Sequence, residues 1–380
     1  MKLPKIRAVE ILPYKEGEFL LRDPLMLSDQ VLVVPEPVVF ILTFLDGESE
    51  EIALKEAFFR RYREMLFSED LQEVLKTLGE NYLLEDEAFR RRMEEIRREF
   101  YSYPYVPMRS LNRGNTDFEA LRRRIREETL PGEGPERGII SPHIDYHRGR
   151  RGYALAYGGW RDLQGKTVVF LGVNHTPFRD KFILSSRGYM TPWGPVEADR
   201  EAVKALEEVL EDPYGDEEAH MFEHSIELNV GYLKALTDFK MVALLTPSFS
   251  PYIERGVLPG EEFSPLFSLL KEMAEDDNYI LVAAADLSHY GRNFGDKEKA
   301  EELLPRVEAL DRRLLREMEA GDAEGFLREF FPHKNATRVC GTGAIYVFLK
   351  SVGKEGKLLG YFNALDPDGT SAVSFAALIY

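Results

Sequence analysis

The sequence predicts an α/β protein whose mainly parallel or mixed sheet is flanked by helices. Apolar runs typical of strands buried on both faces occur at residues 138–143, 168–175 and 280–289. From residue 138 onward, strand-like runs alternate with helix-like runs, which is the pattern of βαβ units. We expect a smaller α+β region of winged-helix type to precede this domain.

The first 85 residues have a different pattern and predict that N-terminal region. It begins with apolar runs at 31–35 and 38–45, followed by the turn Asp46-Gly47 and a helix within 52–67. A helix around Leu71–Leu78, with Gly79 as its C-cap, and a wing or short strand at 82–84 come next. The last expected element is a helix with one apolar face, formed by Phe89, Met93, Ile96 and Phe100. Together they indicate a winged-helix-like extension over residues 1–115.

Helix breakers separate this extension from the larger domain. Two prolines lie within residues 101–107, and a proline- and glycine-rich cluster fills 130–135, so we expect a linker over 116–136 and an α/β domain over 137–380. The domain's further expected strands are 241–245, 357–362 and 372–380, and its expected helices are 199–211, 223–236, 263–274, 297–319 and 341–350.

Composition excludes several classes of protein. No apolar run approaches the roughly eighteen residues of a membrane span, and the first residues lack the pattern of a signal peptide. A net charge of −17 argues against nucleic acid as a partner, and the arginine clusters near residues 90–98 and 122–124 are interleaved with glutamates, as on a solvated helix face. A single cysteine fits a reducing, cytoplasmic setting.

Each of the three apolar runs ends in a histidine. A histidine taken alone is usually structural, but His143, His175 and His289 share this position. Ligands of open α/β sheets bind beyond the carboxyl ends of strands, so these imidazoles can converge on one pocket. Together with Cys340, they would make a transition-metal site.

Other polar residues near these positions have two interpretations each. Cys340 precedes a helix-like segment and is either an activated thiolate or a buried small apolar residue. Asp286 can bind metal or water, orient His289, or cap the strand end through backbone amides. The cluster Glu223-His224-Ser225-Ile226-Glu227 is either an acid–base relay on one helical face or an acidic helix start.

Five motifs in order carry a family resemblance. They are Pro142-His143-Ile144-Asp145-Tyr146, Leu171-Gly172-Val173-Asn174-His175, Glu223-His224-Ser225-Ile226-Glu227, Asp286-Leu287-Ser288-His289-Tyr290-Gly291 and Cys340-Gly341. The chain resembles the Memo family from about residue 138 onward. Bacterial and archaeal members of this family are often labelled AmmeMemoRadiSam system protein B. The N-terminal region resembles an extension found in some bacterial members.

The resemblance implies a fold and a set of site residues. The family's fold is similar to that of class III extradiol dioxygenases, which hold non-haem Fe(II) with two histidines and a glutamate. By this likeness His143 and His175 are metal ligands, and Cys340 stands where the dioxygenases have glutamate. His289 is the expected acid–base residue, acting with Asp286, Glu223 and Glu227. Asp145, Tyr146 and His224 are expected to contact the substrate.

One position departs from the family pattern. The family often has glycine where this chain has Asp145, which adds a carboxylate beside the first expected ligand and removes backbone freedom. This change implies either a substrate contact or an altered metal environment.

These observations favour a metal-dependent redox enzyme, similar to a dioxygenase, that acts on a small molecule of unknown identity. Fe(II) is the expected metal, with copper and zinc as alternatives. A second hypothesis is a metal-binding protein without turnover that binds a protein partner through its N-terminal region. A third is a zinc-dependent hydrolase with Asp286 or Glu227 as base.

Overall fold

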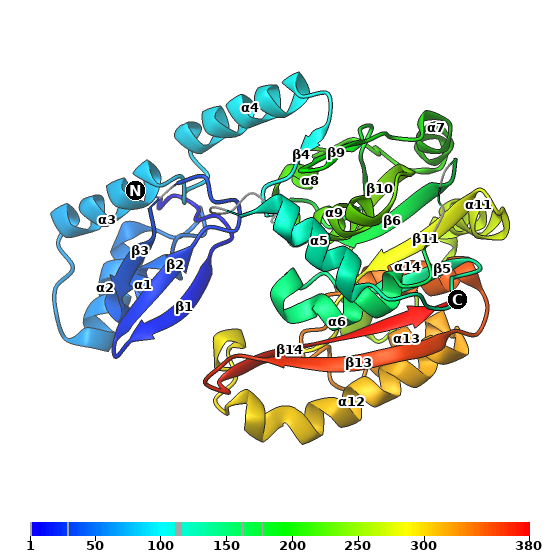
Figure 1. Cartoon of the computed structure of the whole chain (residues 1–380). Helices are drawn as coiled ribbons and strands as arrows, with labels where there is room; N and C mark the ends of the chain where they lie inside the picture. The colour runs from blue at the N-terminus through cyan, green and yellow to red at the C-terminus, as the bar shows by residue number, and fades with distance from the viewer. Residues whose placement is uncertain (1, 29, 111–115, 161–162, 164, 177) are drawn as a thin grey trace. The chain divides into compact units, whose positions relative to one another are not determined.

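The computed structural model of the chain describes residues 2–28, 30–110, 116–160, 163, 165–176 and 178–380 (Figure 1). It divides into two compact units. The first consists of Met1–Ser102 and also takes in the short segment His175–Pro177; the second consists of Tyr103–Asn174 and Phe178–Tyr380. Residue 115, where the N-terminal region is predicted to end, lies outside the described residues.

The N-terminal unit contains a three-stranded antiparallel sheet and four helices. Its strands, in sheet order, are β1 (Glu10–Lys15), β2 (Glu18–Arg22) and β3 (Leu32–Pro35). Its helices are α1 (Glu36–Leu42), α2 (Glu51–Tyr62), α3 (Ser68–Glu80) and α4 (Glu87–Ser102). Sheet and helices fit the predicted α+β class, whereas the winged-helix arrangement stays a prediction.

Local differences from the expected N-terminal elements have simple causes. The apolar run at 38–45 is mostly the helix α1, which begins directly after Pro35 and has Pro37 in its first turn, where proline's missing N–H costs nothing. Gly79 is not a C-cap, because α3 continues to Glu80 and is capped by Asn81. The face of α4 is as expected, with Met93, Ile96 and Phe100 buried.

A mixed sheet forms the centre of the larger unit. The strand order is β12-β14-β5-β11-β6-β10-β7, with β13 paired to β14. The strands are β5 (Gly138–Ser141), β6 (Thr167–Val173), β7 (Ile183–Leu184), β10 (Lys240–Thr246), β11 (Tyr279–Ala284), β12 (His289–Gly291), β13 (Lys357–Leu365) and β14 (Ser371–Ile379). Four neighbours, β5, β11, β6 and β10, are parallel, while β14 and β7 run antiparallel to them.

Helices cover both faces of this sheet. The helices of the unit are α5 (Phe118–Glu128), α6 (Tyr146–Tyr157), α7 (Arg200–Val209), α8 (Ala219–Phe222), α9 (Ser225–Leu236), α10 (Ser250–Arg255), α11 (Ser264–Glu275), α12 (Ala300–Ala320), α13 (Ala323–Glu329) and α14 (Thr342–Val352). On β6, Gly172 faces α9, while the alternate residues Val169 and Leu171 belong to the core cluster that includes α14. The predicted α/β class with a flanked mixed sheet is therefore confirmed.

A small second sheet completes this unit, and one of its helices lies where a linker was expected. The sheet consists of β4 (Val106–Pro107), β8 (Tyr189–Thr191) and β9 (Gly194–Val196). Helix α5 lies within the segment 116–136 that was expected to be a linker. Among the described residues, no helix has both the length and the apolar composition needed to cross a bilayer.

The start of α9 is fixed against the carboxyl end of β6. The Val173 N–H donates to Ser225 Oγ over 3.1 Å, and the Ser225 hydroxyl donates to the Val173 carbonyl over 3.0 Å. A Cβ atom on Gly172 would lie 2.4 Å from Ile226 Cγ1 and 2.8 Å from Ser225 Oγ. Only glycine lets α9 approach the strand this closely, so the sequence Gly172-Val173 sets the position of the helix.

We expect Gly172→Ala to lower the free energy of unfolding by about 1–3 kcal/mol, because the added methyl group overpacks the interface with α9. Urea unfolding followed by circular dichroism measures this change. Gly132→Ala is the matched control, since its added carbon would have its nearest neighbour 3.6 Å away. Equal stability of the two variants would contradict the close approach.

Candidate metal centre

Three imidazoles converge at the carboxyl ends of the central strands. Ligand nitrogens of His143, His175 and His224 all lie within 4.8 Å of one another, the arrangement of a possible metal site. His143 follows β5 and His175 follows β6, while β11 lies between these two parallel strands. The predicted convergence of His143 and His175 is confirmed. His224, expected as a substrate contact, supplies the third imidazole from the turn that precedes α9.

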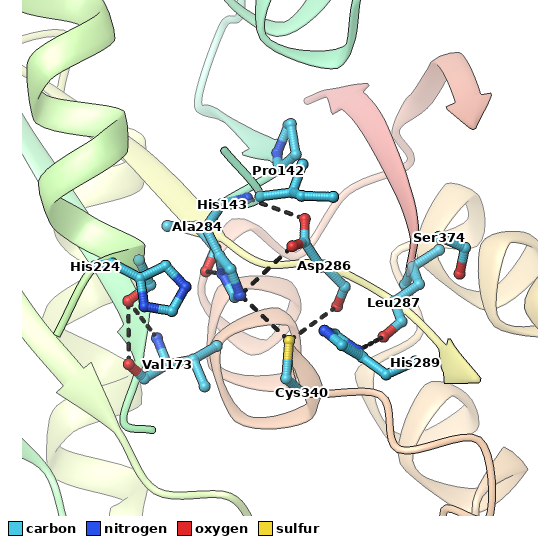
Figure 2. A network of polar contacts seen from close by, with 12 residues as sticks. Pro142, His143, Val173, His224, Ala284, Asp286, Leu287, His289, Cys340 and Ser374 are labelled. Carbon is cyan, nitrogen blue, oxygen red and sulfur yellow. Dashed lines mark hydrogen bonds and ion pairs between the residues drawn. The ribbon is translucent and has the colours of Figure 1, made fainter. Parts of the chain in front are cut away.

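His143 is held in one orientation by its surroundings. The residue is 1% exposed, and its Nδ1 lies 2.8 Å from the Ala284 carbonyl oxygen. A carbonyl oxygen only accepts, so Nδ1 carries the proton and Nε2 keeps its lone pair. The ring of His224 stands nearly perpendicular to that of His143, with centroids 5.4 Å apart. Figure 2 shows Nε2 directed toward Cys340 and Asp286.

Cys340 lies against the same nitrogen. Its Sγ is 3.3 Å from His143 Nε2 and 3.8 Å from the Asp286 carbonyl oxygen. The absence of a side chain on Gly341 allows this close approach of Cys340. A Cβ atom on Gly341 would lie 2.6 Å from both Ala285 Cβ and the Asp286 carbonyl oxygen. The expected helix begins at Thr342, so Cys340 stands just before α14. Its role as a metal ligand stays a prediction, since the three-imidazole group is complete without it.

Asp286 caps the strand end, one of the interpretations that its sequence position allowed, and lies beside the first imidazole. Its Oδ1 accepts the backbone N–H of His143 over 3.0 Å, as a cap would, and its Oδ2 lies 3.7 Å from His143 Nε2. The side chain is almost fully buried. Burial raises the pKa of Asp286, and the nearby His143 opposes this rise. The carboxyl group therefore lies beside the imidazole group and helps to fix the backbone of the first ligand.

His289 reaches the site from a separate short strand. The apolar run 280–289 is not one strand, because β11 ends at Ala284 and His289 opens β12, which pairs with β14. His289 Nδ1 is 3.1 Å from the Leu287 carbonyl oxygen, and its ring packs edge-on against Phe294. Figure 2 shows His289 beside Cys340. Its predicted acid–base role is compatible with this position.

Glu223 and Glu227 do not share a helical face, because α9 begins only at Ser225. Glu223 accepts the backbone N–H groups of His224 and Ser225 over 2.8 and 2.9 Å, and its Oε1 lies 3.4 Å from His224 Nδ1. It therefore positions the turn that carries the third imidazole. The geometry agrees with the acidic helix start rather than with a relay between the two glutamates.

Glu227 fixes a neighbouring segment. Its carboxylate accepts the backbone N–H groups of Arg109 and Ser110 over 3.0 and 2.7 Å. The side chain is buried within α9. Both oxygens accept hydrogen bonds from this segment, which gives Glu227 a structural task; its catalytic role stays a prediction.

Asp145 and Tyr146 also have structural partners. Asp145 is the N-cap of α6, where its carboxylate accepts from the backbone of His147 and Arg148 and from the Arg148 side chain. Burial alone would raise the pKa of Asp145, but the hydrogen bonds from Arg148 lower it on balance. The Tyr146 hydroxyl donates to the Leu228 carbonyl, and burial raises its pKa well above the usual value. Substrate contact by either residue stays a prediction.

Sequence reasoning missed Asn229, which joins two parts of the site. Its Nδ2 donates to the carbonyls of Pro142 and Ser225 over 2.9 and 3.0 Å, and its Oδ1 accepts the Tyr157 hydroxyl over 2.7 Å. It thereby links the residue before His143 to the helix that follows His224. An amide inside the apolar run 226–233 was the available signal, because a buried polar group needs partners.

The donor set fits a transition metal. A metal–nitrogen bond is about 2.0–2.1 Å long, so two ligand nitrogens on one ion are separated by up to about 4 Å. The observed separations, all within 4.8 Å, reach this range with small side-chain rotations. Imidazole nitrogens bind iron, copper and zinc, and a neighbouring thiol adds a soft donor.

His220 is structural, unlike the three converging histidines. It is buried, its Nδ1 lies 2.9 Å from the Tyr189 hydroxyl, and its Nε2 lies 3.0 Å from the Ile183 carbonyl. Nε2 therefore donates and Nδ1 accepts. Burial lowers the pKa of His220 to about 4, so this residue remains neutral in the folded protein near neutral pH.

We expect His224→Ala to weaken Zn(II) or Co(II) binding by at least 10- to 100-fold while changing stability by less than about 0.5 kcal/mol. The side chain makes no cap hydrogen bond to α9, so its loss leaves the helix intact. Competition titration with a chelating dye measures the affinity. His147→Ala is the control, because His147 is exposed and outside the imidazole group. Unchanged affinity in His224→Ala together with loss in Cys340→Ser would make the cysteine the third ligand.

His220 should make the protein less stable in acid. Its folded pKa of about 4 lies below the unfolded value near 6.5, so the unfolded chain binds the proton more readily. Its contribution is complete above pH 6.5 and falls by up to about 3 kcal/mol as the pH drops toward 4. Urea unfolding at several pH values measures the slope, which should be shallower in His220→Gln. An unchanged slope would mean that other groups cause the acid sensitivity.

Comparison with known proteins shows the family to which the chain belongs. The family model described as Memo-like protein matches residues 114–379. A MEMO1 family protein of Aquifex aeolicus is 29% identical over 385 aligned positions, which cover 99% of each chain. A MEMO1 family protein of Thermus thermophilus is 28% identical, covering 88% of this chain and 100% of its own. One from Methanopyrus kandleri is 30% identical, covering 70% of this chain and 94% of its own. The predicted resemblance is confirmed, and the chain belongs to the Memo-like protein family.

Proposed function

We propose that this protein is a metal-dependent redox enzyme that binds iron, or alternatively copper, at His143, His175 and His224. The observation that carries the proposal is the group of three imidazole nitrogens within 4.8 Å of one another. The thiol of Cys340, 3.3 Å from His143 Nε2, adds a soft donor that suits iron or copper. Redox chemistry with dioxygen and a small substrate is what such a metal supplies when bound.

The surrounding residues have separate tasks in this proposal. The Ala284 carbonyl holds the Nδ1 proton of His143, which keeps Nε2 available as a ligand. Asp286 fixes the His143 backbone and places a carboxyl group beside the ligand nitrogens. His289, at the edge of the site, is the residue that can accept or donate a proton to a substrate there.

Contacts of the expected bases bear on the alternative of a zinc hydrolase. A zinc hydrolase needs a carboxylate base directed at a metal-bound water. Glu227 uses its two oxygens on the Arg109 and Ser110 amides, and Glu223 accepts two amides of its own turn. Asp286, the other expected base, has one oxygen on the His143 amide and the second 3.7 Å from His143 Nε2, so hydrolysis would depend on Asp286.

The test is metal content together with oxygen uptake. Protein purified without chelator under anaerobic conditions is expected to hold close to one equivalent of iron or copper. Its exposure to oxygen in the presence of a reductant should give metal-dependent oxygen uptake that the His143→Ala variant loses. The His147→Ala variant, altered at an exposed histidine nearby, serves as control. Zinc as the bound metal, with no uptake after iron or copper loading, would overturn the proposal.

A further inference from the structure

One cavity of the larger unit contains none of the metal-site residues. Its volume is about 420 Å³, within the range of roughly 300–1,000 Å³ typical of small-molecule sites. It opens beyond β10, next to the turn Pro247–Phe249. Its apolar lining comes from Phe182, Val209, Pro247, Phe249, Tyr252, Phe263 and Leu266.

The wall of this cavity is fixed by hydrogen bonds. The Asp180 carboxylate accepts the Ser248 N–H and hydroxyl over 2.6 and 2.7 Å. The Thr342 hydroxyl donates to the Ser248 carbonyl over 2.9 Å. Phe249, which is 1% exposed, has a φ of 56°, a left-handed conformation that costs free energy for a residue with a Cβ. Such strain persists where the surrounding structure enforces it, often at binding sites.

Aromatic rings form the floor and meet one another edge to face. Phe182 and Phe263 have ring centroids 5.5 Å apart at 74°, and Phe249 and Phe263 have centroids 5.6 Å apart at 72°. Phe182 and Phe249 are also T-shaped, at 6.5 Å and 75°. A flat aromatic molecule can continue this herringbone pattern, which is favourable beyond simple burial.

Two of the three carboxylates that line the cavity accept hydrogen bonds from its wall. Asp180 accepts two hydrogen bonds from Ser248, as described, and Glu262 accepts the Tyr252 hydroxyl over 2.6 Å. That hydrogen bond is the main reason why the pKa of Glu262 is lowered. Glu211 is largely exposed, and its only ion pair among the described residues is a long one, 3.9 Å to Lys181. Asp180 and Glu262 thus accept from protein donors, whereas Glu211 is left largely to solvent.

Arg255, which also lines the cavity, has N–H groups that can donate to a ligand. Its Nε donates to the Pro251 carbonyl over 2.9 Å, and its guanidinium lies 5.3 Å from the centre of the Tyr252 ring. Among the described residues it makes no ion pair within 4.0 Å, so its terminal nitrogens can serve an acidic group. The net charge of −17 does not prevent this, because exposed charges more than about 8 Å away are largely screened at physiological salt.

We propose that this cavity binds an aromatic organic anion, with the ring system on Phe182, Phe249 and Phe263 and the acidic group on Arg255. A carboxylate, sulfonate or phosphate would provide the same bidentate acceptor for the guanidinium. The proposal is independent of the metal centre and of its chemistry, since binding requires neither.

The test uses two fluorescent probes that differ in one acidic group. Titration of the full chain with 1-anilinonaphthalene-8-sulfonate is expected to show one saturable site per chain. N-phenyl-1-naphthylamine, which lacks the sulfonate, should bind at least 10-fold more weakly. A naphthylmethylammonium ion, which has the opposite charge, should compete poorly with the sulfonate probe.

Two variants locate the site. Arg255→Gln should weaken the sulfonate probe at least 10-fold and the uncharged probe less than 2-fold, whereas Arg123→Gln, at an exposed arginine elsewhere, should change neither. Val209→Phe should remove binding of both probes by filling the cavity. Thermal unfolding of each variant verifies folding, and Arg255→Gln decides the result if Val209→Phe is unstable.

Three outcomes would overturn the proposal. The first is the absence of a saturable site at millimolar probe. The second is equal weakening of both probes in Arg255→Gln, or full binding of the sulfonate in that variant. The third is tighter binding of the ammonium ion than of the sulfonate, which would make the cavity a site for organic cations. None of these results would affect the metal titrations, so the two proposals fail separately.

Discussion

The contact of α9 with the end of β6 determines the geometry of the candidate metal centre. Gly172 provides the space, and two hydrogen bonds between Ser225 and Val173 fix the helix start. One turn later, Asn229 ties α9 to Pro142, the residue before His143. A shift of α9 would therefore move His224. The same shift would strain the hydrogen bond from Asn229 to Pro142, next to His143. Interiors packed at this density transmit small displacements rather than absorb them.

Behind the site, a buried polar group stabilises the segment that carries Asp286 and His289. Asp311 on α12 is fully buried and accepts the hydroxyls of Ser288, Ser374 and Tyr361. Burial raises the pKa of Asp311, while these hydrogen bonds lower it. A buried carboxyl group is costly unless its hydrogen-bonding capacity is used, so the three hydroxyls also specify one arrangement of the strand ends.

The sequence predicts an element well where its hydrophobic periodicity is strong. It does not predict features of the structure that depend on tertiary contacts. Apolar runs predict the central strands, and the strand-end rule predicts that His143 and His175 lie together. Nothing local indicated that β14 would pair antiparallel with β5, because pairing depends on partners distant in the chain. His224 was assigned a different role because its direction depends on the bend between α8 and α9. Periodicity also could not separate α1 from a strand, since a short apolar run is compatible with both.

The strand order also determines when the metal centre can form. β5 and β6 are close in sequence, yet they do not pair with each other; both pair with β11, which the chain reaches only at residue 279. During synthesis, His143 and His175 emerge early but lack the strand that sets their separation. Contacts of such long sequence separation form late, because closing the intervening loop costs entropy first. The imidazole group therefore forms only once the sheet has folded, and a metal ion can bind these side chains together only then.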